Sequence, residues 1–163
     1  MSIEFKPITK ENIPAALNIY NWYVLNSTAT FHLKAVPHKE LERMVSIGHS
    51  KYQSFVIEYN NEICGFCYLS QFRYKEAYDK SAEITLYLKQ GCLGKGIGKT
   101  TLVYLENIAK ENGINNLVAV ITEGNDASIA LFEKLGYFKV GHLKNIGIKF
   151  GEALDVVSYQ KEI

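Results

Sequence analysis

The densest glycine cluster in this 163-residue chain is the segment GCLGKGIGK, which runs from Gly91 to Lys99. It follows an apolar segment at residues 82–89 with the composition of a β-strand, and residues 100–112 after it carry leucines and alanine at helical spacing. A glycine-rich turn between a strand and a helix presents several backbone N–H groups at the helix N-terminus, where they bind phosphate groups. The segment therefore predicts a strand–turn–helix unit. Two interpretations of it stay open: a phosphate-binding loop, or a glycine turn without a ligand.

Two common phosphate-binding motifs do not fit this segment. A nucleoside-triphosphate loop, G-x-x-x-x-G-K-[ST], whose lysine is Lys99 needs its first glycine at position 93, which is Leu93. The next apolar strand is followed by Thr122 rather than by the aspartate that such enzymes use for magnesium. A dinucleotide loop, G-x-G-x-x-G, that starts at Gly94 needs a glycine where the chain has Lys99. Neither ATP nor NAD is therefore the expected ligand.

The rest of the chain alternates between strand-like and helix-like segments. In chain order the expected elements are strand 3–8, a helix capped at Thr9 or Asn12 that runs to about Tyr23, a helix after Pro37, strands 55–59, 63–70 and 82–89, helix 100–112, strand 117–122, a helix capped at Asn125 and closed by Gly136, and strands 137–143 and 153–160. A polar loop is expected between the last two strands, and strand 117–122 is expected to be buried on both faces. The order predicts one α/β (α+β) domain over residues 1–163 with a mixed sheet.

The charge balance excludes several classes of partner. Lysine and arginine total 18, and aspartate and glutamate total 17, which gives a formal net charge of +1. A general nucleic-acid-binding protein shows a basic excess, so no nucleic-acid partner is expected, and the balance gives no support for a membrane-binding patch. The first residues lack the apolar core of a signal peptide, and no run approaches the roughly 18 apolar residues of a membrane helix. The expected location is the cytoplasm.

Three cysteines, Cys64, Cys67 and Cys92, argue against a disulfide framework because their number is odd. Cys64 and Cys67 match the C-x-x-C spacing of redox pairs and zinc sites. Their flanks predict a strand, however, on which residues three apart point to opposite faces. We therefore expect two small core residues rather than a reactive pair. The histidines are scattered without metal-ligand spacing, and no metal is expected.

Two motifs resemble the GNAT acetyltransferase family. Residues Gly94–Gly98 resemble its acyl-CoA pyrophosphate loop, [QR]-x-x-G-x-[GA], with Leu93 in place of the usual Gln or Arg. The segment NDASIALFEKLGY, from Asn125 to Tyr137, is similar to the family's second motif, N-x-x-[AS]-x-x-[LF]-[YF]-[EK]-K-x-G-[FY]. The resemblance covers nearly the whole chain. It implies a mixed, mostly antiparallel sheet with a splayed central strand pair flanked by helices.

Further segments are similar to the phosphinothricin acetyltransferase and amino-acid N-acyltransferase branch of that family. They are TATF at 28–31, FR at 72–73, AY at 77–78, AEITLYL at 82–88 and GEALDV at 151–156. This resemblance implies direct transfer of an acetyl group from acetyl-CoA to the primary amine of a small amino acid or amino-acid analogue. Relatives in this branch are commonly dimers, so a homodimer is expected.

The resemblance also implies roles for individual residues. Glu83 is the expected base that takes a proton from the amine, directly or through water. The substrate is expected to contact Glu83, Phe31, Phe72, Arg73 and Tyr78, with the Arg73 guanidinium holding a carboxylate bidentately. Acetyl-CoA is expected to be bound by the strand residues Leu86, Tyr87 and Leu88, by the loop residues Leu93, Gly94, Lys95, Gly96, Ile97, Gly98 and Lys99, and by Asn125 and Lys134.

Some of these assignments have plainer alternatives. On composition alone Glu83 is an exposed strand-end carboxylate, Asn125 a helix cap and Lys134 a solvated helix residue. Phe132 stands where many relatives carry the tyrosine that protonates the CoA thiolate, so no general acid is assigned. Two other functions stay open: acetylation of protein N-termini or lysines, and a catalytically silent acyl-CoA sensor.

Overall fold

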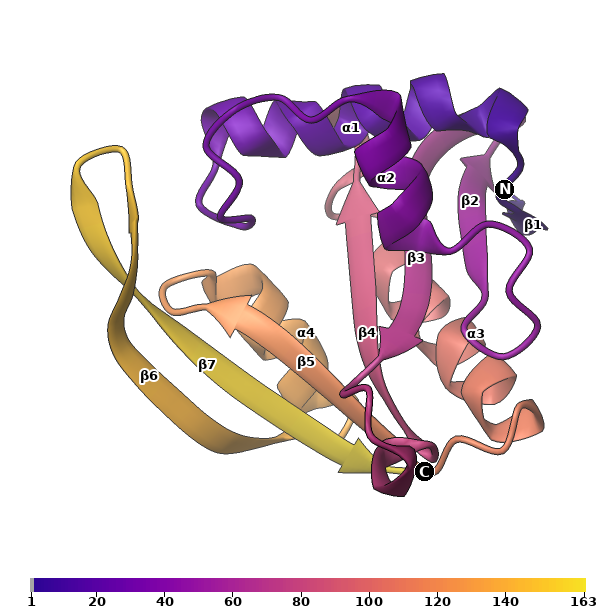
Figure 1. The fold of residues 1–163 in the computed structure, drawn as a ribbon. Coiled ribbons are helices and arrows are strands. Elements are labelled where there is room, and N and C mark those ends of the chain that lie inside the picture. The colour runs from indigo at the N-terminus through magenta and orange to yellow at the C-terminus, as the bar shows by residue number, and fades with distance from the viewer. Residues whose placement is uncertain (1) are drawn as a thin grey trace.

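The computed structural model describes residues 2–163, and a seven-stranded sheet with helices against both faces forms their framework (Figure 1). The strands are β1 (Ile3–Pro7), β2 (Ser54–Tyr59), β3 (Glu62–Gln71), β4 (Ser81–Leu88), β5 (Asn116–Thr122), β6 (Phe138–Lys149) and β7 (Glu152–Glu162). The helices are α1 (Ile13–Asn26), α2 (His38–Val45), α3 (Ile97–Glu111) and α4 (Asp126–Lys134), with short 3-10 helices η1 (Lys10–Asn12), η2 (Glu76–Tyr78) and η3 (Gln90–Cys92). The order of strands and α-helices along the chain confirms the predicted α/β organisation.

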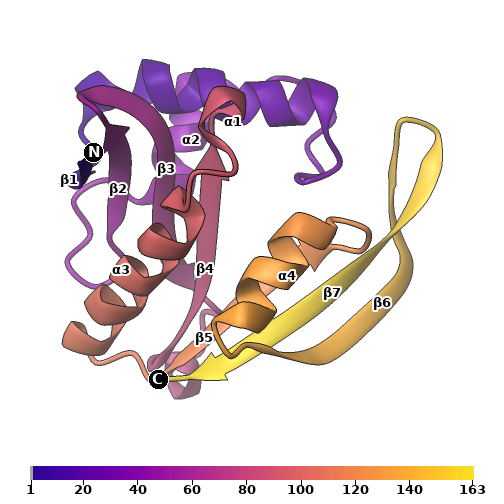
Figure 2. The same ribbon diagram turned by 180° about the vertical axis from the view of Figure 1, so that it is seen from behind.

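The strands lie in the order β1-β2-β3-β4-β5-β7-β6, and every neighbouring pair is antiparallel except β4 and β5. β4 and β5 pair in parallel only at Ser81–Asn116, Ala82–Leu117 and Glu83–Val118. Beyond that point the two strands diverge into a V, which both views of the ribbon show (Figures 1 and 2). The mixed sheet with a splayed central pair is therefore confirmed.

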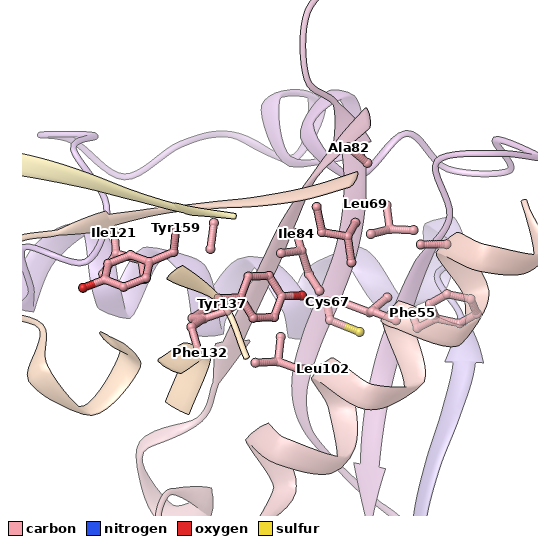
Figure 3. Packing of buried hydrophobic residues seen from close by; sticks show 14 of the residues in the cluster. Phe55, Cys67, Leu69, Ala82, Ile84, Leu102, Ile121, Phe132, Tyr137 and Tyr159 are labelled. Atoms are coloured by element: carbon pink, nitrogen blue, oxygen red, sulfur yellow. The ribbon is translucent and has the colours of Figure 1, made fainter. Parts of the chain in front are cut away.

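Two hydrophobic clusters hold the helices on opposite faces of the sheet. α1 and α2 cover the half of the sheet that contains β1–β4, and their buried residues pack with Val56 and Phe66. α3 and α4 lie on the other face (Figure 2), where Leu102 and Phe132 belong to the same cluster as Ile84. Figure 3 shows this second cluster from close by. The two clusters fix the directions of β4 and β5 and so hold the V open.

The last two strands correct one expectation. The polar loop predicted between them does not form, because β6 continues to Lys149 and β7 begins at Glu152. Pairing with β7 supplies backbone hydrogen bonds regardless of side-chain polarity, and the register shifts between Leu143 and Gly147 absorb the irregular sequence. The hairpin turns at Phe150 and Gly151, which both have positive φ angles.

Three smaller expectations also change. Strand 117–122 is buried mainly on the face toward α4, and Val120 on the other face is 47% exposed, because α1 and α2 do not extend over β5 (Figure 1). α1 continues to Asn26 rather than ending near Tyr23. α3 begins at Ile97, three residues before the predicted start, so the last glycine of the cluster, Gly98, lies inside the first turn of the helix.

Within residues 2–163 no helix is long and apolar enough to cross a membrane.

Gly65 on β3 provides a test of this strand packing. A Cβ atom at Gly65 would lie 2.6 Å from the Tyr87 carbonyl oxygen and 2.7 Å from Leu88 Cδ2. We expect Gly65→Ala to lower the free energy of unfolding by about 1–3 kcal/mol, because the backbones of β3 and β4 must move apart. Gly91→Ala is the matched control, since a Cβ there meets nothing within 4 Å. Urea unfolding of both variants measures the difference, and equal stabilities would contradict this packing.

Candidate active site

The glycine cluster forms an open loop between η3 and α3. Gly94 and Gly96 have φ angles of +73° and +77°, which side chains rarely tolerate and glycine adopts freely. A Cβ atom at either position would meet nothing within 4 Å, so the space beside this backbone is open. Leu93 beside them is 50% exposed. The predicted turn is confirmed, and its backbone is accessible to a ligand.

The N-terminus of α3 follows this loop directly. The first turn contains no acidic residue, and the helix bond from the Thr100 N–H to the Gly96 carbonyl oxygen is 3.2 Å long. The amides of Ile97, Gly98 and Lys99 therefore come before the helical hydrogen-bond ladder and are free to bind an anion. The helix dipole adds positive potential at the same place.

Close packing ties this helix end to α4 and to β4, the first of the two diverging strands. A Cβ atom at Gly98 would lie 3.0 Å from Leu131 Cδ2 of α4 and 3.7 Å from Leu86 Cδ2 of β4. Only a residue without a side chain fits at this distance without displacing a neighbour. The contact places the exposed amides next to the V between β4 and β5.

The unpaired part of β4 turns main-chain groups toward this V. The Lys89 N–H donates to the Cys64 carbonyl oxygen of β3 at 2.7 Å. Because successive residues of a strand direct their amides to opposite sides, the Leu88 N–H and C=O face away from β3 and into the V. The Leu88 carbonyl oxygen accepts a hydrogen bond from the Tyr23 hydroxyl of α1. The Leu88 N–H is thus a fixed donor beside the gap.

Glu83 lies at the last paired position of β4 before the strands diverge, opposite Val118 of β5. Its side chain is half-buried. Burial raises the pKa of the Glu83 carboxyl above its ordinary value, and the nearby Arg73 guanidinium opposes this shift. A carboxylate whose pKa is raised by desolvation accepts a proton more readily than one in water. The plainer alternative, a fully solvated carboxylate, is wrong for this residue.

Three of the predicted substrate residues, Phe72, Arg73 and Tyr78, lie together on the segment between β3 and β4, and Arg73 is near enough to Glu83 to act on its pKa. The Arg73 guanidinium carbon lies 4.3 Å from the Phe72 ring centroid, and Arg73 Nη1 donates to the Phe72 carbonyl oxygen at 2.8 Å. The Phe72 and Tyr78 rings meet edge to face with centroids 5.5 Å apart. Arg73 itself is exposed, so its guanidinium is available to a ligand.

The fourth predicted substrate residue, Phe31, belongs to a different element. Its ring packs against Gly147 of β6, where a Cβ atom would lie 2.3 Å from Phe31 Cε2. Residues 27–31, which we call the acceptor loop, connect α1 to the rest of the chain and lie above the open end of the V (Figure 1). The Thr30 hydroxyl of this loop is 2.7 Å from the Tyr20 hydroxyl of α1, and the Tyr20 ring meets the Tyr87 ring of β4 edge to face at a centroid distance of 5.2 Å. Tyr20 therefore connects the acceptor loop to the unpaired part of β4.

The remaining predicted cofactor residues lie on α4, near the start of α3 and in the glycine loop. Asn125 caps α4, and its side chain accepts a hydrogen bond from the Ser128 N–H at 3.4 Å. Lys134 is exposed at the opposite end of α4. Lys99 is exposed near the start of α3, whereas the Lys95 ammonium lies 5.4 Å from the Tyr59 ring centroid. The helix-cap role of Asn125 is confirmed, and it is compatible with a ligand contact.

Phe132 and Tyr137 are core residues. Phe132 is 5% exposed and meets the Tyr137 ring edge to face at a centroid distance of 4.9 Å (Figure 3). Tyr137 is 3% exposed, and burial raises the pKa of its hydroxyl. Neither residue is placed to give a proton to a group in the V.

Cys64 and Cys67 are core residues, as predicted. Cys64 and Cys67 are free and buried on β3. Burial raises the pKa of the Cys64 thiol to about 12, and its neighbour is Cys92 rather than Cys67. The C-x-x-C spacing is therefore a coincidence of strand composition.

Sequence reasoning missed three residues around the V: Tyr23, Thr30 and Lys149. Tyr23 is three residues after Tyr20, and this helical spacing could have suggested that both face the sheet. Thr30 lies in the segment TATF at 28–31, and the resemblance of this segment to the family implies no role for Thr30. Lys149 fell in the segment predicted as a polar loop, so nothing indicated that it is 2% exposed.

Comparisons with known proteins agree with this geometry. Residues 6–157 match the model of the family described as "Acetyltransferase (GNAT) domain". The phosphinothricin N-acetyltransferase of Streptomyces viridochromogenes is 30% identical, over 98% of this chain and 87% of that protein.

Two solved structures are similar over the whole chain. A phosphinothricin acetyltransferase from Sinorhizobium meliloti in complex with AcCoA has a TM-score of 0.93 and 30% identity, covering 100% of this chain and 89% of that one. The ribosomal-protein-alanine N-acetyltransferase from Brucella melitensis has a TM-score of 0.92 and 32% identity, with 100% of both chains covered. The splayed strands, the glycine loop and these matches lead to one conclusion: the chain belongs to the GNAT acetyltransferase family.

Proposed function

We propose that this protein transfers the acetyl group of acetyl-CoA directly to the primary amine of a small amino acid or amino-acid analogue, of the phosphinothricin or methionine-derivative type. One observation carries the proposal. A half-buried carboxylate, Glu83, lies where β4 and β5 diverge, and the exposed guanidinium of Arg73 is near enough to act on its pKa. An amino acid carries an amine and a carboxylate on one carbon, so a carboxylate and a guanidinium at one site suit both groups.

Acetyl-CoA fits the groups around the V. Acetyl-CoA supplies an activated thioester. The open backbone of Gly94 and Gly96 and the amides at the start of α3 suit its pyrophosphate, with Leu93, Lys95, Ile97, Gly98 and Lys99 completing that segment. The unpaired edge of β4 at Leu86, Tyr87 and Leu88 suits the amides of its pantetheine arm, and Asn125 and Lys134 are further proposed contacts.

The amine must lose a proton before it attacks, because an ammonium has no free electron pair. The Glu83 carboxylate takes this proton, directly or through a water molecule. Burial keeps the Glu83 pKa raised, which strengthens it as a base. The Leu88 N–H donates to the oxygen that becomes negative as the amine adds to the thioester. Because Phe132 has no proton to give, the thiolate either leaves unprotonated or is protonated by water.

The acceptor pocket is proposed to have two walls. Phe72, Arg73 and Tyr78 form the wall on the β3–β4 segment, with Arg73 holding the substrate carboxylate. Phe31 of the acceptor loop forms the other wall. Aromatic walls exclude water from the amine and strengthen the electrostatic contacts inside.

We also propose a homodimer in the cytoplasm. β6 is an edge strand of the sheet, and it and the turn that follows carry large apolar side chains, each about half exposed or more: Phe138, Val140, Leu143, Ile146 and Ile148 on the strand, and Phe150 in the turn. An edge strand with such a surface is suited to a second copy of the chain. The three free cysteines agree with a reducing compartment, where acetyl-CoA is available.

A second candidate function is acetylation of a protein N-terminus, because a ribosomal-protein-alanine N-acetyltransferase is 32% identical over the whole chain. The two candidates separate in one experiment. Free CoA thiol is measured after incubation with acetyl-CoA and either amino acids, including phosphinothricin and methionine sulfone, or peptides with an N-terminal alanine. We expect thiol release with the amino acids. Release with peptides alone favours the second candidate, and binding of acetyl-CoA with no release favours a silent sensor.

The role of Glu83 is tested by Glu83→Gln. We expect turnover to fall by about 10²–10⁴-fold, because the amine loses its base, while the affinity for acetyl-CoA stays unchanged. The base works only when deprotonated, so wild-type kcat/KM rises with pH through a Glu83 pKa above the ordinary 4.5, and this acidic limb disappears in the variant. Glu62→Gln, on the exposed end of β3, is the control. Wild-type turnover in Glu83→Gln at every pH removes Glu83 from the mechanism.

The glycine loop is tested by Gly96→Ala. Strain at the positive φ angle shifts the loop backbone, so the dissociation constant for acetyl-CoA is expected to rise about tenfold in isothermal titration. Gly113→Ala is the matched control, because Gly113 has a φ angle of +78°, nothing within 4 Å of its Cβ position, and lies outside the V. Equal losses of affinity in both variants would show that the loop does not bind acetyl-CoA.

The dimer is tested by Leu143→Glu combined with Ile148→Glu. These side chains are 55% and 73% exposed on β6, so charging them leaves the protomer folded and separates the two copies. Analytical ultracentrifugation is expected to give twice the 18.4 kDa protomer mass for the wild type and the protomer mass for the variant. Val103→Glu, on an exposed part of α3, is expected to stay dimeric. A monomeric wild type would refute this surface as an interface.

A further inference from the structure

Lys149 is a buried cation near the open end of the V. It is 2% exposed, and its Nζ atom donates to the Thr30 carbonyl oxygen of the acceptor loop at 2.8 Å. Among residues 2–163, no carboxylate lies within 4.0 Å of this ammonium. Burial accordingly lowers the pKa of Lys149. A buried charge held by a neutral carbonyl is a costly arrangement for stability alone.

The same short loop is held from two other directions. The Thr122 hydroxyl at the end of β5 donates to the Thr28 carbonyl oxygen at 2.6 Å. The Thr30 hydroxyl is 2.7 Å from the Tyr20 hydroxyl of α1. The Phe31 ring presses on Gly147, two residues before Lys149 on β6. Elements from both halves of the sheet therefore converge on the acceptor loop.

The position of the loop has consequences inside the V. The Thr30 hydroxyl is bonded to the Tyr20 hydroxyl, and the Tyr20 ring meets the ring of Tyr87, on the unpaired part of β4, edge to face at a centroid distance of 5.2 Å. Phe31 is the neighbouring residue of the same loop. A shift of Thr30 therefore moves a wall of the acceptor pocket, whereas the glycine loop and the start of α3 have their own supports at Leu131 and Leu86.

We propose that Lys149 is a positioning residue for the acetyl acceptor: it latches the β6–β7 hairpin to the acceptor loop and so sets the affinity for the amine without affecting acetyl-CoA. The charge makes the bond to the Thr30 carbonyl stronger than a neutral donor would. The proposal rests on the amino-acid acetylation proposed above. It adds a specificity role for the hairpin, which reaches the pocket from the far edge of the sheet.

Lys149→Met keeps the apolar stem and removes the donor. We expect the KM for the amino-acid substrate to rise about tenfold, with kcat and the dissociation constant for acetyl-CoA changed less than twofold. Lys149→Gln keeps an N–H donor and is expected to recover part of the lost affinity. Lys144→Met, at an exposed position of the same strand, is the control and is expected to match the wild type.

Hydrogen exchange measures, without any substrate, how firmly the bond from Lys149 to the Thr30 carbonyl (the latch) holds the acceptor loop. Backbone amides of residues 27–31 are expected to exchange faster in Lys149→Met, and also in Thr122→Val, which removes the bond to Thr28 from the other side. Unchanged exchange together with an unchanged amine KM in Lys149→Met overturns the proposal, as does an equal loss of acetyl-CoA affinity. If the wild type acetylates no amino acid, the proposed function fails, and the exchange of residues 27–31 alone decides whether the latch exists.

Discussion

The incomplete pairing of β4 with β5 is the constraint on which the rest of the site depends. Parallel strands that stayed paired would use the main-chain groups of both edges in the sheet. Here pairing with β5 stops at Glu83, and the following residues of β4 pair with no strand other than β3. The freed edge must find other partners. The Leu88 carbonyl oxygen accepts a hydrogen bond from the Tyr23 hydroxyl, and the Leu88 N–H remains directed at the gap.

Packing on opposite faces of the sheet maintains this gap. One cluster anchors β4 under α1 and α2, and the other joins β4 and β5 to α3 and α4. Gly98 is a close contact in this arrangement and lets the start of α3 approach both β4 and α4. The cofactor side of the V is thus built from rigid elements. The acceptor side depends on a loop that is tied down from α1, β5 and the β6–β7 hairpin.

Local sequence rules predicted the features that arise from local chemistry. The glycines at Gly94 and Gly96 indicated a turn, for which the structure shows positive φ angles, and the Asn125 cap was readable from its neighbours. Family resemblance added what local rules do not contain, namely the expectation that Arg73 and Glu83 act on one substrate. The long-range contacts escaped both methods. Lys149 is buried only because the hairpin folds against a loop 119 residues earlier in the chain, and no local pattern encodes such a contact.

We propose that the gap between β4 and β5, together with the glycine loop, holds acetyl-CoA for direct transfer to an amine. Backbone amide shifts in a 1H–15N spectrum, followed during titration with acetyl-CoA, locate this binding. The largest changes are expected on residues 86–88 and 94–99, the two segments beside the V. Changes confined to other surfaces, or saturation without any change at residues 86–88, would contradict it.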